Sequence, residues 1–345
     1  MSNTEDRTLT VAGMEMDLYP LLFEPNRKTL VWGTEDWTVS AVPGSESVIA
    51  NGSWAGTKLD RLISLCPERV LGADVAQANG GKMPLLMKII DARQDLSIQV
   101  HPNDEMAMRK HGKSGKSEMW YIMDAKPGAT LYAGFNEHIT QDEYSTMVTF
   151  GTITQVLARH KVGKGDVFYL PAGRVHAICG GIRLAEIQQS SDVTYRIFDY
   201  NRPGIDGKPR ELHTKLAQQA IDFNVYPEYR TQHRQDFEKA NEIIDTPHFS
   251  AKVIETGRPF HRDMMKYGSF IIVTSLEGDC IVRLSEAGHD SEQQVVVPAG
   301  SSCLIPAAVA NYYLIPVQSS AKVLEAFINN RRSLGRQVID FFHMA

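Results

Sequence analysis

One short pattern occurs twice in this chain and constrains its fold more than any other feature. Residues 165–176 place an apolar run before a Pro-x-Gly turn, and the turn delivers one histidine, His176. Residues 300–311 align with this segment without a gap, with Asn311 in place of the histidine. A strand that enters a tight turn explains the pattern, and its recurrence indicates a duplicated β domain. The second copy is expected to keep the strand and the turn but to have lost a metal ligand.

Most of the remaining chain consists of short apolar or alternating runs that Gly, Pro and Asp interrupt. Such runs are typical of antiparallel strands in a sandwich or barrel. They occur at residues 84–91, 96–101, 117–123, 129–135, 166–170, 175–188, 194–200, 249–255, 268–275, 279–284, 293–297, 302–305, 311–316 and 321–327. We therefore predict a mainly β fold of two jelly-roll β-barrels, with a small helical segment between and around them. The predicted domains are residues 1–245, which carry the site and helical insertions, and residues 246–345, which lack metal ligands.

Three segments have helical signals instead. Thr140 and Glu143 form a capping-box pattern that opens a helix ending near Phe150, and residues 152–159 extend the signal as a second helix. Residues 211–223 repeat apolar side chains at helical spacing, which predicts an amphipathic helix. Its predicted core stripe is Leu212, Leu216, Ala220 and Phe223.

Alternation along two upstream strands places polar side chains on common faces. In the run 96–101, Ser97, Gln99 and His101 project to one side, and in the run 117–123 Glu118 shares a face with Trp120 and with Lys116 before it. Together with the histidine of the turn they offer two imidazole nitrogens, one carboxylate oxygen and one amide oxygen. This mixed, open set fits a catalytic divalent ion, and imidazole makes zinc the leading choice. The predicted ligands are Gln99, His101, Glu118 and His176.

Each of these residues also has an ordinary structural explanation. A lone histidine at a strand end is more often hydrogen-bonded structure than a ligand. Gln99 alone would be a satisfied polar residue, and Glu118 alone a solvated charge at a sheet edge. Convergence from three separate strands favours the metal site. The other histidines, which include His289 and His343, have no matching partner and are interpreted as structural.

Composition excludes several classes of partner. The 345 residues, 43% of them hydrophobic, are enough to bury a large core and favour about two domains. A net charge of -5 without a long Lys/Arg tract argues against nucleic acid and anionic membranes as partners. No apolar run approaches the length of a membrane span, and residues 1–7 are polar and acidic, so we expect a cytoplasmic protein. The 4 cysteines are scattered without C-x-x-C spacing, which argues against a thiolate metal site or a disulfide framework.

Two family resemblances follow from these motifs. Residues 165–176 resemble the second motif of the cupin superfamily, G-x5-P-x-G-x2-H, so the predicted barrels are cupin-type. The chain also resembles the short, bacterial kind of type I mannose-6-phosphate isomerase, although Gly33–Trp37 departs from that family's Gly-Glu-x-Trp run. A Gln-x-His pair and a Gln-Gln-Ser-Ser-Asp-x-Thr-Tyr-Arg run separate this family from other cupins. The resembling segments keep the family order and are Pro84–Ala92, Leu96–Pro102, Gly115–Tyr121, Leu170–Ala177, Ala185–Arg196, Asp199–Tyr200 and Arg210–His213.

The resemblance implies one zinc ion per chain at the four predicted ligands and reversible conversion of mannose 6-phosphate to fructose 6-phosphate through an enediol. A metal that polarises the substrate oxygens and a nearby base suit this chemistry. Arg196 is the first choice to hold the enediolate or to orient the substrate. Glu186 is the candidate base, with orientation of Arg196 as its alternative role. Lys116 and Ser97 are candidates for phosphate capture, with a solvated loop lysine as the competing view. Without the family, a structural salt bridge would be the preferred reading of Arg196.

Other functions fit parts of the pattern. An iron-dependent cupin oxygenase would use the same fold, but Gln99 and the polar set around it argue against that chemistry. A sensor that binds a sugar phosphate without turning it over would keep the pocket, although the intact ligand set and Arg196 disfavour it. An isomerase of a related sugar phosphate is the closest rival. The expected partner in each isomerase or sensor reading is a small sugar phosphate, and the expected state is a monomer or homodimer.

Overall fold

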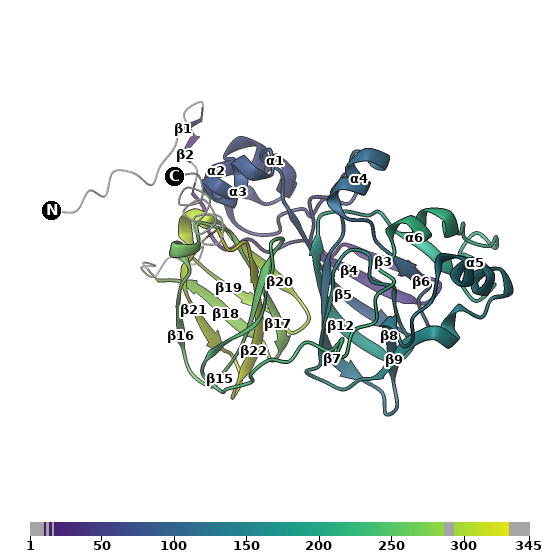
Figure 1. Ribbon diagram of the computed structural model, residues 1–345. Coiled ribbons are helices and arrows are strands. Elements are labelled where there is room, and N and C mark those ends of the chain that lie inside the picture. Colours follow the sequence, from purple (N-terminus) through teal and green to yellow (C-terminus); the bar gives the residue numbers. More distant parts are fainter. Residues whose placement is uncertain (1–9, 12–13, 16, 286–292, 331–345) are drawn as a thin grey trace, which may run out of the picture. The chain divides into compact units, whose positions relative to one another are not determined.

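The computed structural model describes residues 10–11, 14–15, 17–285 and 293–330 (Figure 1). These residues form two compact units, each discontinuous in the sequence. The site unit comprises Pro25–Ser47 and Met83–Ile254, and the companion unit comprises the described residues up to Glu24, Val48–Lys82 and those from Glu255 onward. The predicted domains, residues 1–245 and 246–345, are each one continuous segment, whereas each of these units combines separate segments of the chain. Residues 1–7, His289 and His343 lie outside the described residues.

Two antiparallel sheets build the site unit. A six-stranded sheet has the order β10-β7-β12-β5-β4-β3, and a five-stranded sheet has the order β13-β6-β11-β8-β9. The six strands are β3 (Arg27–Leu30), β4 (Gly33–Val39), β5 (Leu85–Ala92), β7 (Glu118–Ala125), β10 (Val167–Leu170) and β12 (Ile182–Gln189). The five are β6 (Ile98–Val100), β8 (Thr130–Phe135), β9 (Leu157–Lys161), β11 (His176–Ile178) and β13 (Tyr195–Phe198). Further along the chain, β14 (Ala240–Asp245) and β15 (Ser250–Thr256) form an antiparallel pair.

The core of the site unit lies between its two sheets. Trp120 and Phe168 of the six-stranded sheet pack in one buried cluster with Leu131 and Ile178 of the five-stranded sheet. This confirms the mainly β, antiparallel fold class. In the described part of the chain the two sheets remain separate, so the predicted barrel is an open sandwich.

Helices cover the outer face of the five-stranded sheet (Figure 1). Tyr144 of α5 (Gln141–Phe150) and Ala217 of α6 (Thr214–Ala220) are buried in one cluster with Val100 and Tyr195. The predicted capping box is confirmed, because Thr140 Oγ1 accepts from the Glu143 backbone and the Glu143 carboxylate accepts from the Thr140 backbone. A third helix, α4 (Asp104–His111), follows β6 and was not predicted from the sequence.

Two helix predictions need correction. The segment predicted as a helix at 152–159 forms a short 3-10 turn, η2 (Ile153–Val156), and then enters β9. The sheet edge offers backbone partners to this β-branched segment, which outweighs its weak helical pattern. The predicted helix 211–223 is shorter than expected, and Leu212, assigned to its core stripe, is 45% exposed.

The companion unit repeats the strand architecture and adds helices. Its strands β17 (Ile271–Glu277), β20 (Ser302–Ile305) and β22 (Ala321–Phe327) are adjacent in one sheet, and β16 (Phe260–Asp263), β18 (Cys280–Leu284), β19 (Gln294–Val297) and β21 (Asn311–Pro316) form a second. The helices α1 (Leu59–Leu65), α2 (Pro67–Leu71) and α3 (Ala73–Ala78) were not predicted. Smaller elements are β1 (Thr10–Val11), β2 (Met14–Glu15), η1 (Gly52–Trp54), η3 (Met265–Tyr267) and η5 (Ala307–Val309).

The sequence repeat is present in the structure. β10 begins at Val167 and β11 at His176, and at the aligned positions β20 begins at Ser302 and β21 at Asn311. The strand and turn therefore occur in both units, as predicted, with asparagine at the second histidine position. Among the described helices none has the length and apolarity needed to cross a membrane.

Gly72 lies at a tightly packed point in the helical part of the companion unit. It connects α2 and α3 at φ 95°, and a Cβ there would lie 1.9 Å from the carbonyl oxygen of Gly268. We expect Gly72→Ala to lower the free energy of unfolding by about 3 kcal/mol or more, because a left-handed backbone cost adds to a backbone clash. Chemical denaturation measures the change.

Gly56→Ala is the matched control for this prediction. Gly56 also has a positive φ, 81°, but a Cβ there meets no atom within 4 Å. Only the backbone cost of about 1–2 kcal/mol should remain. Equal losses in the two variants would show that the clash at Gly268 is relieved at little cost.

Candidate metal centre and active site

Three neighbouring strands of the five-stranded sheet carry one row of polar side chains. His176, the first residue of β11, pairs with Gln99 of β6, and Gln99 pairs on its other side with Arg196 of β13. Directly opposite residues of antiparallel strands project to the same face. The register therefore places His176, Gln99 and Arg196 on one face of the sheet.

The facing sheet supplies the carboxylate. Glu118 begins β7, and its Oε1 lies 3.1 Å from His176 Nε2, while its Oε2 lies 3.5 Å from Nε2 of His101, the residue after β6. Ligand atoms of these three residues all lie within 4.8 Å of one another, and all three side chains are buried. The structure thus brings together three of the predicted ligands, and the fourth, Gln99, places its Nε2 3.4 Å from His176 Nε2.

Backbone carbonyls set the orientation of both imidazoles. His176 Nδ1 lies 2.8 Å from the Arg174 carbonyl oxygen, and His101 Nδ1 lies 2.9 Å from that of Val193. Because a carbonyl oxygen only accepts, each Nδ1 carries a proton, and in the neutral imidazole Nε2 then keeps its lone pair. Both lone pairs point toward Glu118. Such backing of a ligand histidine is the usual arrangement around protein-bound metals.

The cluster is rich in acceptors. Glu118 Oε1 is buried and accepts no hydrogen bond from the described residues, although the unprotonated His176 Nε2 lies beside it. Two imidazole nitrogens and a buried carboxylate oxygen without a hydrogen-bond partner in the described part of the chain form a donor set that a cation would satisfy. The amide of Gln99 can present its oxygen after a rotation of the amide group, whose two ends are not distinguished by shape. The residues present therefore fit a divalent metal ion.

Lys116 adds a positive charge beside the ligands. Its Nζ lies 2.9 Å from Glu118 Oε2 and 3.1 Å from His101 Nε2. Burial and the Lys116 charge lower the pKa of His101 to about 3, so its imidazole is neutral at neutral pH. Burial opposes ionisation of Glu118, but Lys116 and the histidines outweigh it and hold the pKa of Glu118 well below its usual range. His101 and Glu118 are thus in the protonation states that metal binding requires.

Ser97 also contacts the ligand row. Its side chain is buried, and its hydroxyl donates to the side-chain oxygen Oε1 of Gln99 at 3.4 Å. Lys116 is likewise buried. Both predicted substrate-binding residues therefore face the ligand cluster, away from bulk solvent.

Glu186 lies in a second buried network on β12. One carboxylate oxygen is 3.0 Å from Lys88 Nζ, and the other accepts from Trp120 Nε1 at 2.7 Å. The Trp120 ring in turn meets His176 edge-on, with centroids 5.3 Å apart. Burial opposes the charge on Lys88, but Glu186 and Glu35 outweigh it and raise the Lys88 pKa. The two networks are therefore continuous through Trp120.

Sequence reasoning missed Glu35 as a member of this network. Glu35 of β4 accepts from Trp37 Nε1 at 2.7 Å and lies 3.6 Å from Lys88 Nζ. Burial opposes its charge, but Lys88 and Trp37 outweigh burial and lower the Glu35 pKa. It belongs to the Gly33–Trp37 segment, which departs from the family pattern. The available signal was its spacing of two from Trp37, which places both side chains on one strand face.

The Arg196 side chain has one nitrogen that makes a hydrogen bond and another that makes none within the described part of the chain. One of its Nη atoms donates to the Glu211 carbonyl oxygen at 2.8 Å. Its Nε is buried and has no hydrogen-bond partner among the described residues. Burial, together with the nearby charge of Arg210, lowers the pKa of the guanidinium. Its position opposite Gln99 leaves it facing the same space as the metal-ligand candidates.

Comparisons with known proteins agree with this geometry. Residues 24–136 match the family model described as the phosphomannose isomerase type I catalytic domain. The chain is 37% identical over 283 residues to the mannose-6-phosphate isomerase ManA of Bacillus subtilis, an alignment that covers 76% of this chain and 87% of that protein. The chain belongs to the type I phosphomannose isomerase family. The resemblance found in the sequence is therefore confirmed.

Other members of the family support the assignment. The mannose-6-phosphate isomerase of Streptococcus mutans is 39% identical over 188 residues, which cover 54% of this chain and 57% of that protein. The crystal structure of mannose 6-phosphate isomerase from Bacillus subtilis superposes with a TM-score of 0.79 at 27% identity, covering 89% of this chain and 99% of that chain. The apo enzyme from Salmonella typhimurium, at 17% identity and a TM-score of 0.69, shows the shared fold over 90% of this chain and 99% of that chain.

Proposed function

We propose that this type I phosphomannose isomerase interconverts mannose 6-phosphate and fructose 6-phosphate. The observation that carries the proposal is the buried convergence of two unprotonated imidazole nitrogens on the Glu118 carboxylate. Similarity to proteins named mannose-6-phosphate isomerase supplies the substrate. The geometry supplies a place where the substrate's carbonyl and hydroxyl oxygens can be polarised.

We infer that Gln99, His101, Glu118 and His176 hold one zinc ion per chain. Two imidazoles, one carboxylate and one amide oxygen match the donors that zinc takes in catalytic sites. When bound, the ion acts as a Lewis acid that lowers the cost of negative charge on the substrate oxygens. Lys116 lies between two of the ligands, and its charge is placed to assist the same stabilisation.

Glu186 is the proposed proton carrier for the isomerisation. The reaction removes a proton from C2 of the aldose and returns it to C1, while a second proton moves from the C2 hydroxyl to the C1 oxygen. An ionised carboxylate at hydrogen-bond reach of both carbons can accept and return the first proton. Lys88 and Trp120 hold the two Glu186 oxygens in a fixed orientation. The charge on the resulting enediolate would be balanced by Arg196.

Lys116 and Ser97 remain the proposed substrate-binding residues, but we now assign them to the sugar oxygens of the substrate in place of its phosphate. Both are buried against the ligand row. Burying a charged phosphate costs far more desolvation free energy than burying a hydrogen-bonded sugar hydroxyl. We therefore expect contact with the sugar oxygens near the reacting carbons.

The companion unit is proposed to have a structural role. Among the described residues the only cluster of three suitable ligands is the one in the site unit. The second copy of the repeat has Asn311 at the aligned histidine position. We further propose that the protein acts in the cytoplasm as a monomer or homodimer.

A coupled assay tests the proposed function directly. Purified protein is given mannose 6-phosphate, and fructose 6-phosphate formation is followed before chelation, after chelation and after zinc is restored. We expect turnover to vanish with the metal and to return with zinc. Folded, zinc-loaded protein without turnover would point to a related sugar phosphate or to a sensor, and recovery with a different metal alone would contradict zinc.

A further inference from the structure

A pocket opens at the end of the site unit's strands opposite the candidate metal centre. Glu118 begins β7, whereas Lys126 of the pocket follows its last residue, about 25 Å further along at the usual strand rise. Likewise His176 begins β11, and Gly180 of the pocket follows that strand. The pocket has a volume of about 510 Å³, which is within the range of small-molecule sites. It is therefore separate from the proposed active site.

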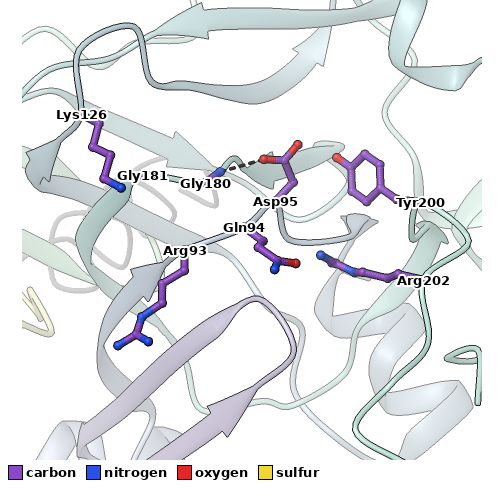
Figure 2. Close-up of a pocket in the computed structure, with 8 residues that line it drawn as sticks. All are labelled: Arg93, Gln94, Asp95, Lys126, Gly180, Gly181, Tyr200 and Arg202. Carbon is purple, nitrogen blue, oxygen red and sulfur yellow. Dashed lines mark hydrogen bonds between the residues drawn. The ribbon is translucent and has the colours of Figure 1, made fainter. Parts of the chain in front are cut away.

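The charge around this pocket is mainly positive. Figure 2 shows Arg93, Lys126 and Arg202 around it, with Asp95 as the acidic residue. Asp95 already accepts from the Gly180 backbone at 2.8 Å. Arg202 is paired with Asp199 at 2.9 Å. Two of these cations are left without a carboxylate.

Those two uncompensated cations are exposed. Within the described ranges neither Arg93 nor Lys126 makes an ion pair, and both side chains lie on the surface of the unit. Long exposed side chains can turn toward a bound anion, at the cost of their rotamer freedom. A carboxylate or phosphate between them would have two charge-assisted contacts.

Tyr200 provides an independent sign of a ligand. Its backbone has φ 56°, and that of the next residue, Asn201, has φ 53°, so two consecutive non-glycine residues occupy the left-handed region. Such strain is concentrated at functional sites. The buried Tyr200 hydroxyl has no hydrogen-bond partner in the described chain, and Figure 2 shows it turned toward Asp95. Burial, and then the Asp95 charge, raise the Tyr200 pKa, so the hydroxyl remains a donor.

We propose that this pocket binds a phosphorylated small metabolite, with its phosphate between Arg93 and Lys126. The Tyr200 hydroxyl and the Gln94 amide, which also line the pocket, are placed to bind the polar body of the ligand. Phosphate is favoured over carboxylate because two separated cations match its larger charge and number of oxygens. The site does not depend on the proposed catalytic chemistry.

Titration calorimetry of the metal-loaded full chain tests this proposal. Inorganic phosphate and fructose 6-phosphate are titrated separately into wild-type protein and into the double variant Arg93→Ala/Lys126→Ala. We expect the variant to lose one class of phosphate site, with affinity at least about tenfold weaker there. Tyr200→Phe should weaken fructose 6-phosphate more than inorganic phosphate at the same site.

The control removes the same charge elsewhere. Lys110 on α4 and Lys215 on α6 are both exposed, and Lys110→Ala/Lys215→Ala should bind phosphate as wild type does. Stronger binding of fructose 6-phosphate than of phosphate would identify a sugar phosphate, and equal binding would identify the phosphate group alone. Unchanged phosphate binding in the pocket variant, or no saturable phosphate binding in wild type, would overturn the proposal. Isomerase activity is measured in parallel, so failure of the proposed function is seen separately.

Discussion

His176→Ala protein is expected to lose its bound metal and its isomerase activity together. The Nε2 of His176 is one of the two imidazole nitrogens in the proposed ligand set and lies 3.1 Å from Glu118 Oε1. Removing residues that only support a metal ligand already costs about 10–100-fold in metal affinity, so removing a ligand should cost more. We expect kcat/KM to fall by at least about 10³-fold. Metal content by atomic emission and the coupled assay measure the two losses.

Arg196→Ala should separate metal binding from turnover. Arg196 faces the same space as Gln99 but contacts the Glu211 carbonyl, so the ligand set is left intact. The variant is expected to retain metal at the wild-type ratio and to lose about 10²–10³-fold in kcat, which is typical for the loss of a group that stabilises developing negative charge.

A surface histidine serves as the control for these two variants. His138 is exposed, and His138→Ala should keep both metal and activity. A His176→Ala enzyme that remains active with a full complement of metal would eliminate the proposed metal site. Loss of metal in Arg196→Ala would instead show that the arginine supports the ligands.

Glu325→Ala is expected to destabilise the companion unit by about 3–5 kcal/mol. Glu325 of β22 is fully buried and accepts from Arg262 at 2.8 and 2.6 Å and from the Tyr312 hydroxyl at 2.7 Å. Burial opposes the charge on Arg262, but Glu325 outweighs it and raises the Arg262 pKa. Removing the carboxylate leaves a buried guanidinium without its counter-ion, which is far more costly than losing an exposed pair.

Thermal unfolding followed by circular dichroism measures this change. At about 2–4 °C per kcal/mol for a unit of this size, the companion unit's Tm should fall by roughly 6–20 °C. Glu255→Ala is the matched control, because Glu255 pairs with Lys322 at 3.0 Å but its side chain is 40% exposed. It should cost at most about 1 kcal/mol. Similar Tm values for the two variants would show that water or another side chain replaces the buried carboxylate.

The two units differ in what occupies the polar part of their interiors. In the site unit, acceptor atoms of His101, Glu118 and His176 converge and fit a cation. In the companion unit, the charge of Glu325 is already balanced by Arg262, and the Tyr312 hydroxyl donates a further hydrogen bond to it. Both units thus contain the repeated strand-and-turn element. In the companion unit, an internal ion pair accounts for the buried carboxylate.

Local patterns in the sequence determined the elements that carry the site. A side-chain period of two placed Gln99 and His101 on one strand face, and the Pro-x-Gly turn placed His176 at the start of the next strand. The capping box of α5 is equally local, since its two partners are three residues apart. These features depend on residues that are close together in the sequence, so they can be predicted from the sequence alone.

Long-range register decided the rest. Lys88 and Glu186 are 98 residues apart, and Arg262 and Glu325 are 63 apart, so no local pattern links them. The sequence also could not show that α1–α3 join the C-terminal strands in one unit, or that the segment after Thr152 would enter a sheet edge. Sequence determined which side chains share a strand face. Only tertiary structure decided which faces meet, because burial and backbone pairing between distant segments set that choice.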